Sequence, residues 1–132
     1  MTRFGRPALG FAPILGIALA VAACGGTPSS SGPAASLPEG TIAVEAKEYS
    51  FTPSTITVPA GNVTFSVHNV GSQEHEFEIF QGDTVVDEVE KLVPGLTKDL
   101  TVPLQAGEYT FKCLLSGHDQ LGMTGTLTVT GS

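Results

Sequence analysis

The stretch from Tyr109 to Val129 constrains the fold of this chain more than any other, because two alternating runs of residues flank one short loop. Phe111 and Cys113 share one parity before the loop, and Met123 and Leu127 share another after it. Successive side chains of a β-strand point to opposite faces. The pattern therefore predicts two strands, with Cys113 and Met123 facing the packed interior as their apolar neighbours do.

The same alternation recurs through the rest of the chain, at residues 42–46, 63–67 and 75–79, with turn-forming Gly, Pro and Asn residues between the runs. Residues 84–92 are ambiguous, because their valines suit either a helix or a strand. No repeat of fixed period is visible. We therefore expect an all-β fold of about eight short strands, arranged as a two-sheet β-sandwich of Greek-key type.

Residues 1–23 resemble a secretory signal peptide. Arg3 and Arg6 precede an apolar run from Ala8 to Ala23, which is short for a membrane-spanning helix. The run ends in Val-Ala-Ala-Cys, which looks like a bacterial lipobox, so we expect cleavage before Cys24 and a lipid on its thiol. An ordinary secretory cleavage site beside a chance cysteine is the alternative.

Residues 24–40 are rich in Gly, Ser, Pro and Ala, which is typical of a flexible tether, and residues 41–132 are expected to form the folded domain. The formal net charge is −7, and removal of Arg3 and Arg6 with the signal makes it −9. Such a charge excludes nucleic acid as a partner. Lipidation of Cys24 would leave Cys113 without a disulfide partner, and metal ligation would give this lone thiol a role.

Cys113, His118 and Met123 lie in one loop and are candidate metal ligands. A fourth ligand must come from elsewhere in the chain. His75 shares the parity of the apolar residues that follow it, so its side chain should face inward at the start of a strand. His68 has the opposite parity to its apolar neighbours, so it should face solvent.

Two histidines, a cysteine and a more weakly bound methionine match the ligand set of blue-copper sites. We therefore expect one copper ion bound by His75, Cys113, His118 and Met123. Zinc is the rival metal. Structural zinc sites usually take a further Cys or His and catalytic sites a water, so zinc would leave Met123 without a role.

The sequence resembles the cupredoxin family of plastocyanin- and azurin-like proteins over residues 41–130. Three pieces carry the resemblance: residues 51–65, residues 69–75, and residues 107–127 with their Cys, His and Met. The family implies a Greek-key sandwich that cycles between Cu(I) and Cu(II). It also implies that His118 lies at the surface, where electrons enter and leave, within a ring of apolar residues. Leu114, Leu115 and Leu121 are candidates for that ring.

The chain also departs from the family pattern. Many relatives have Asn after the first His and Ser or Thr after the Cys, and these residues tie the two loops together. Here Glu76 and Leu114 stand at those positions, and no Pro lies between Cys113 and His118. The ligand set survives these changes, but the bonds around it cannot be transferred from the family.

These features predict a membrane-tethered blue-copper protein, a one-electron carrier on the outer face of the cytoplasmic membrane or in the periplasmic space. Its partner would be a redox protein such as a cytochrome or a membrane oxidase. The alternative is a copper-binding lipoprotein for copper delivery or homeostasis. An enzyme is not expected, because copper enzymes of this superfamily need further histidines and only His68 is spare.

Three further alternatives rest on few residues. Cys113 and His118 could form a hydrolytic pair, although an inward-facing Cys beside Met disfavours it. A metal-free adhesive sandwich would leave the thiol unexplained. Glu74, Glu76 and Glu78 could capture cations, but we expect them to form a solvated strand face.

Overall fold

The computed structural model describes residues 37, 38 and 40–131. The predicted signal peptide, the lipobox with Cys24 and most of the predicted tether lie outside these residues. Among the described residues, no helix has the length and apolar character needed to cross a membrane.

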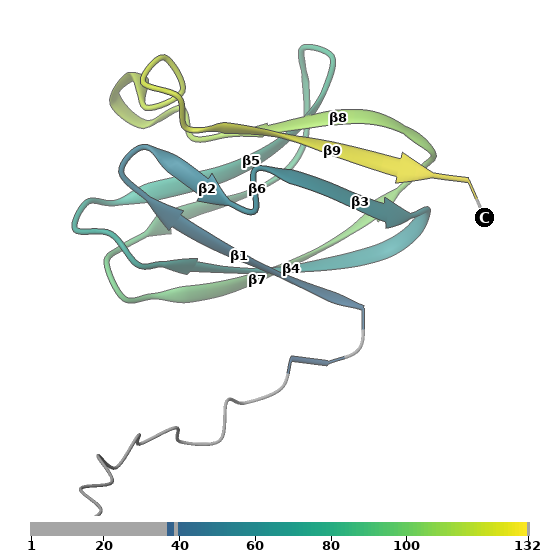
Figure 1. Ribbon diagram of the computed structural model, residues 1–132, viewed down its shortest axis with the longest axis horizontal. Helices are drawn as coiled ribbons and strands as arrows, with labels where there is room; N and C mark the ends of the chain where they lie inside the picture. The colour runs from purple at the N-terminus through teal and green to yellow at the C-terminus, as the bar shows by residue number, and fades with distance from the viewer. Residues whose placement is uncertain (1–36, 39, 132) are drawn as a thin grey trace, which may run out of the picture. The chain divides into compact units, whose positions relative to one another are not determined.

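Nine strands form two sheets that face each other (Figure 1). The first sheet has the order β2-β1-β4-β7 and contains β1 (Thr41–Lys47), β2 (Ser50–Thr52), β4 (Gly61–Asn69) and β7 (Thr97–Leu104). The second has the order β3-β9-β8-β5-β6 and contains β3 (Thr55–Pro59), β5 (His75–Gln81), β6 (Thr84–Leu92), β8 (Gly107–Lys112) and β9 (Thr124–Thr130).

The predicted all-β sandwich is confirmed, with nine strands in place of eight. The additional strand is β2, a three-residue strand that folds back to pair antiparallel with β1. The ambiguous segment is β6, which pairs antiparallel with β5 along its length. Its valines could not distinguish a strand from a helix, because Val86 is exposed at the sheet edge and only Val89 is buried.

A cluster of four aromatic rings joins the two sheets inside the sandwich. Phe51 of β2 and Phe65 of β4 each lie with their ring centroids 5.5 Å from that of Phe77 on β5. Phe111 of β8 lies 5.1 Å from Phe77 and 5.4 Å from Phe51. Such spacings are typical of favourable aromatic pairs. The strand that begins at His75 and the strand that leads to Cys113 are thus fixed by a common core.

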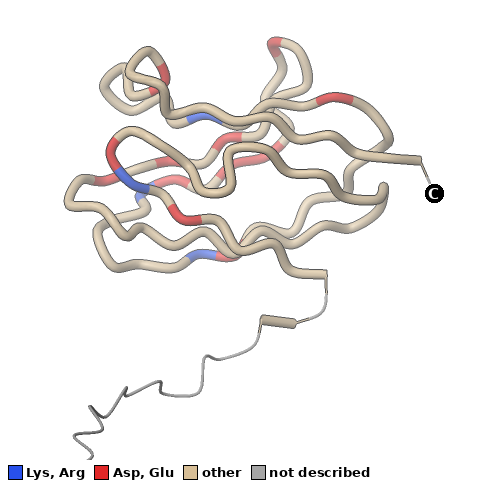
Figure 2. Tube along the Cα trace, in the orientation of Figure 1, with Lys and Arg blue, Asp and Glu red and all other residues tan. Residues whose placement is uncertain are grey.

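Three connections gather at one end of the sandwich: the β1–β2 turn, the β4–β5 loop and the β8–β9 loop (Figure 1). The last contains a short 3₁₀ helix, η1 (Leu115–Gly117). Acidic positions outnumber basic ones over the described chain (Figure 2). The candidate ligands all belong to this end.

Candidate metal centre

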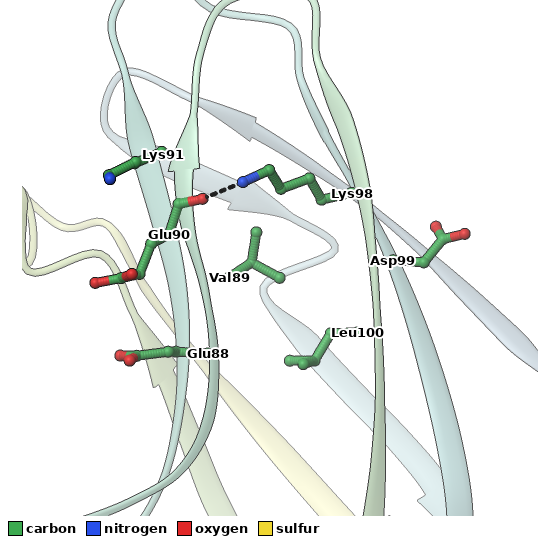
Figure 3. Close-up of a pocket in the computed structure, with 7 residues that line it drawn as sticks. All are labelled: Glu88, Val89, Glu90, Lys91, Lys98, Asp99 and Leu100. Atoms are coloured by element: carbon green, nitrogen blue, oxygen red, sulfur yellow. Dashed lines mark hydrogen bonds between the residues drawn. The ribbon is translucent and has the colours of Figure 1, made fainter.

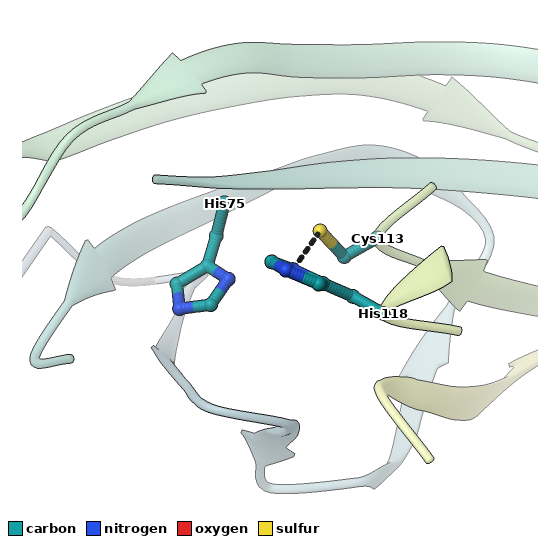
Figure 4. A group of neighbouring side chains, drawn as sticks. All are labelled: His75, Cys113 and His118. Carbon is teal, nitrogen blue, oxygen red and sulfur yellow. Dashed lines mark hydrogen bonds between the residues drawn. The ribbon is translucent and has the colours of Figure 1, made fainter. Parts of the chain in front are cut away.

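The structure brings three of the four predicted ligands together. One ligand atom from each of His75, Cys113 and His118 lies within 4.8 Å of the other two, and all three residues are buried (Figure 4). The Sγ atom of Cys113 is 3.4 Å from Nδ1 of His118. Metal–ligand bonds of about 2.0–2.3 Å place the ligands of one ion roughly 3–4.5 Å apart. The three donors therefore lie close to the spacing that the ligands of a single ion require.

Met123, the fourth predicted ligand, is fully buried and closes the same loop. Its N–H donates to the carbonyl of His118 at 3.0 Å, and its carbonyl accepts from the N–H of Cys113 at 3.1 Å. The three loop residues are therefore held to one another by their main chains.

His75 supplies the strongest indication that this cluster holds a metal. Both of its ring nitrogens are buried, and neither has a hydrogen-bond partner. Unpartnered buried polar atoms are costly and rare in native proteins. Burial lowers the pKa of His75, with a smaller opposing effect from the Glu48 carboxylate. A neutral imidazole with a free nitrogen facing a thiol and a second imidazole is suited to metal coordination.

Cys113 is the candidate thiolate ligand of the cluster. Burial raises the pKa of its thiol, and hydrogen bonds from the main chains of Glu76 and Leu115 partly oppose that shift. A metal binds the thiolate, so metal binding must release the thiol proton. The Glu76 N–H lies 3.3 Å from Sγ and points a donor at the sulfur.

The Glu76 contact joins two loops at the position where many relatives have Asn. The tie between the β4–β5 and β8–β9 loops comes from the main-chain N–H of Glu76 to Cys113, and main-chain groups are common to every residue except proline. An Asn side chain is not needed for it.

His118 differs from what the resemblance implies. The residue is only 4% exposed, so it is not a surface histidine. The ring of Tyr49 packs against it, with centroids 4.8 Å apart. Leu114 and Leu121 are exposed and Leu115 is half-buried, so the loop does present apolar side chains to solvent. His68 is exposed, as its parity predicts.

The β1–β2 turn contributes two residues that the sequence pattern did not identify, Glu48 and Tyr49. The Glu48 carboxylate lies 3.5 Å from Nε2 of His75. Hydrogen bonds from its own main chain and that of Gln73 are the main causes that lower the pKa of Glu48 to about 2. Strand alternation carries no information about turn residues, so only the folded structure places them beside the histidines.

The expectation of a solvated acidic face is wrong for Glu78. This side chain is buried between β6 and β8, where it lies beside Glu88 and Lys112. Burial, followed by repulsion from Glu76 and Glu88, raises the pKa of Glu78 to about 7.

Glu78→Gln is expected to change how stability depends on pH. The folded chain keeps its proton on Glu78 between the unperturbed pKa of 4.5 and the raised pKa of about 7, whereas the unfolded chain loses it. The free energy of unfolding therefore falls as pH rises through that window, by about 1–3 kcal/mol. The Gln variant should lack this decline in urea titrations, whereas the exposed control Glu45→Gln should retain it. Parallel profiles for Glu78→Gln and wild type would contradict the assignment.

A groove between β6 and β7 lies apart from the ligand cluster (Figure 3). The Lys98 ammonium donates to the Glu90 carbonyl across it at 2.7 Å. Its lining is Glu88, Val89, Glu90, Lys91, Lys98, Asp99 and Leu100. None of the candidate ligands lines it, so it adds nothing to the metal centre.

Comparison with known proteins shows which sequences and folds this chain is similar to. Residues 16–129 match the family model of the cupredoxin-like domain. The iron uptake system component EfeO of Yersinia pseudotuberculosis is 40% identical over 99 residues, which cover 75% of this chain and 25% of that protein. The EfeO protein of Escherichia coli K12 is 39% identical over 80 residues, covering 61% of this chain and 21% of that protein. The chain thus matches about a quarter of the length of these curated relatives or less.

Solved structures share the fold. A reduced auracyanin from Roseiflexus castenholzii superposes with a TM-score of 0.64 at 22% identity, over 69% of this chain and 97% of that one. Auracyanin A from Chloroflexus aurantiacus, described as a blue copper protein, gives 0.63 at 24% identity, over 68% and 98%. Reduced rusticyanin gives 0.53 at 24% identity, over 69% and 80%.

Proposed function

This chain belongs to the cupredoxin-like family, and from that premise we propose that it binds one copper ion through His75, Cys113, His118 and Met123 and carries single electrons. The observation that supports the proposal most is the buried His75–Cys113–His118 cluster, with two unpartnered nitrogens on His75. The donor set favours copper over zinc, because two nitrogens, a thiolate and a thioether suit a blue-copper site.

Copper bound there would supply one-electron exchange between Cu(I) and Cu(II). The chain contributes rigidity and exclusion of water. His75 begins a strand of the core, and main-chain hydrogen bonds join Cys113, His118 and Met123. Burial of all four side chains keeps bulk water from the donors. A site that is fixed in this way needs little rearrangement when its charge changes, and this favours rapid electron transfer.

The proposed setting follows from the N-terminal sequence. A lipid on Cys24 and a tether over residues 24–40 would hold the domain at the outer face of the cytoplasmic membrane or in the periplasmic space. There it would exchange electrons with a redox protein such as a cytochrome or a membrane oxidase. We propose a carrier and not an enzyme.

A second candidate function is copper delivery or homeostasis. The similarity to proteins named as components of an iron uptake system favours some role in metal handling. The two functions differ in what the site gives up: an electron in a carrier, and the copper ion in a delivery protein. A carrier should keep its copper through many cycles of reduction and reoxidation, whereas a delivery protein should pass it to a metal-free acceptor.

Titration of the metal-free chain with Cu(II) tests the proposal. We expect an intense visible thiolate band that saturates at one equivalent, bleaches with a reductant and returns on reoxidation without loss of copper. A preference for zinc with no visible band would refute the copper assignment. Rapid loss of copper to an apo-oxidase would favour delivery.

Met123→Leu should retain the copper but raise its reduction potential. Loss of a thioether donor disfavours the more highly charged Cu(II) state, and axial ligands tune the potential of such sites. A shift on the order of 59 mV corresponds to a tenfold change in relative affinity. Voltammetry measures it, with His68→Ala as the control that should leave potential and colour unchanged. Complete loss of copper from Met123→Leu would contradict the expectation that Met123 is the more weakly bound ligand.

A further inference from the structure

The β1–β2 turn places a carboxylate beside the metal centre, on the side of His75 away from the other donors. One oxygen of Glu48 accepts hydrogen bonds from the N–H groups of Ser72 and Gln73, both at 2.6 Å. The same oxygen lies 3.5 Å from Nε2 of His75. Glu48 thus fastens the loop that leads into His75 and approaches the His75 ring from a segment distant in sequence.

The position of this carboxylate depends on the glycine at residue 71. A Cβ atom added to Gly71 would come within 2.5–2.8 Å of the Glu48 carboxyl group, which is closer than real Cβ contacts. Gly71 itself is held by the Asn69 side chain, which accepts its N–H at 2.8 Å. The absence of a side chain at residue 71 is therefore what admits the Glu48 carboxylate to its position.

The adjacent residue of the same turn contacts the other histidine. Tyr49 packs edge-on against His118, and its hydroxyl accepts a hydrogen bond from the Gln73 side chain at 3.2 Å. The two histidine rings themselves lie 5.2 Å apart, centroid to centroid. The two residues of this turn therefore flank both imidazoles of the cluster.

The two nitrogens of His75 face different groups. Nε2 is the nitrogen near Glu48, whereas the nitrogen next to the ring's attachment point, Nδ1, faces His118 (Figure 4). A metal on Nδ1 requires the ring proton to be on Nε2. The present 3.5 Å separation is longer than an N–H···O hydrogen bond, which spans about 2.7–3.2 Å, so a ring shift of a few tenths of an ångström would complete it.

We propose that Glu48 is a positioning residue for the metal centre. Glu48 holds His75 in the Nε2–H form, directs Nδ1 at the ion and biases the site toward Cu(II). This inference rests on the proposed function. A carboxylate that accepts the second N–H of a ligating histidine orients the ring and strengthens it as a donor, and losing such a partner typically costs about 10–100-fold in metal affinity. Its negative charge also favours the more positive oxidation state.

Glu48→Gln separates the charge from the loop contacts. The Gln oxygen can still accept from Ser72 and Gln73, but the charge is lost. We expect Cu(II) affinity to fall about 10-fold, with Cu(I) affinity much less affected. The reduction potential should then rise by about 59 mV for each tenfold difference between the two affinities. Chelator competition and voltammetry on the full chain measure the two effects.

Two further variants complete the design. Gly71→Ala keeps the carboxylate but displaces it, so it should shift the potential in the same direction as Glu48→Gln. Glu45→Gln removes an equal charge from an exposed position on β1 and should shift nothing. In the metal-free chain, ¹⁵N NMR of His75 should report the Nε2–H form in wild type and a mixture of both tautomers in Gly71→Ala, where the acceptor oxygen is displaced.

Several results would overturn the inference. Equal shifts in Glu48→Gln and Glu45→Gln would reveal only a net-charge effect. Equal losses of Cu(I) and Cu(II) affinity in Glu48→Gln, with an unchanged potential, would mean that Glu48 only stabilises the loop and does not tune the metal. An unchanged His75 tautomer in Gly71→Ala would also count against it. Failure of wild type to bind copper would instead refute the proposed function, while the tautomer measurement would still test the contact between Glu48 and His75.

Discussion

Cys113→Ser is expected to abolish the visible band of the copper-loaded chain completely. The band requires a sulfur-to-copper bond, and a serine hydroxyl remains protonated and binds copper poorly. Cys113 is fully buried and its Sγ lies 3.4 Å from His118, so no other thiol of the described chain can replace it. Cu(II) affinity should fall by more than the roughly 10–100-fold that follows loss of an outer partner of a ligand. Absorption spectroscopy and chelator competition provide the two measurements.

Cys24→Ser is the matched control, because it makes the same substitution at the only other cysteine of the chain. It should keep the band and the affinity, and it should lose the lipid that we propose is attached to this residue. A band that persists in Cys113→Ser but disappears in Cys24→Ser would show that the sulfur ligand is misassigned.

Gly125→Ala is expected to give the largest loss of stability among the substitutions considered. A Cβ atom at this position on β9 would clash with the Phe111 ring and come within 2.6 Å of the Ser54 carbonyl oxygen. That carbonyl already accepts the N–H of Thr126 at 2.9 Å, so the backbone cannot move without loss of this bond. Overpacking of a core typically costs about 1–3 kcal/mol, and we expect the upper end of that range. Urea unfolding of the metal-free chain measures it.

Gly131→Ala is the control, because a Cβ there would meet no atom within 4 Å. Its effect should stay within about 0.5 kcal/mol, as for most surface substitutions. A loss at Gly125 no larger than that at Gly131 would mean that the Phe111 ring can move aside at little cost.

The sequence predicted the fold and most of the site because both depend on strand alternation. Parity alone distinguished the buried His75 from the exposed His68, and it placed Cys113 and Met123 in the interior. These residues lie in or beside regular strands, where a side chain's direction follows from its position along the strand. The family resemblance added the expectation of copper to that geometry.

The remaining features depend on contacts between segments far apart in the chain. Glu48 and Tyr49 lie in a turn, and nothing local indicates that they meet the two histidines. Burial of Glu78 depends on its neighbours across β6 and β8. The nearly buried His118 packs against the Tyr49 ring, which comes from a distant part of the sequence. Alternation describes the side-chain directions of one strand at a time, so it gives no information about contacts between distant segments.

The four donors come from two parts of the molecule, three from the hydrogen-bonded β8–β9 loop and one from a strand. Three of them belong to one continuous segment whose internal bonds require nothing from either sheet, whereas His75 belongs to the framework. Residues 113–123 could therefore be exchanged for a loop of another length, with its own cysteine and histidine, while the nine strands stay as they are. Such grafts would vary the colour and the donor spacing of the centre on a constant scaffold, with the framework histidine as the invariant member.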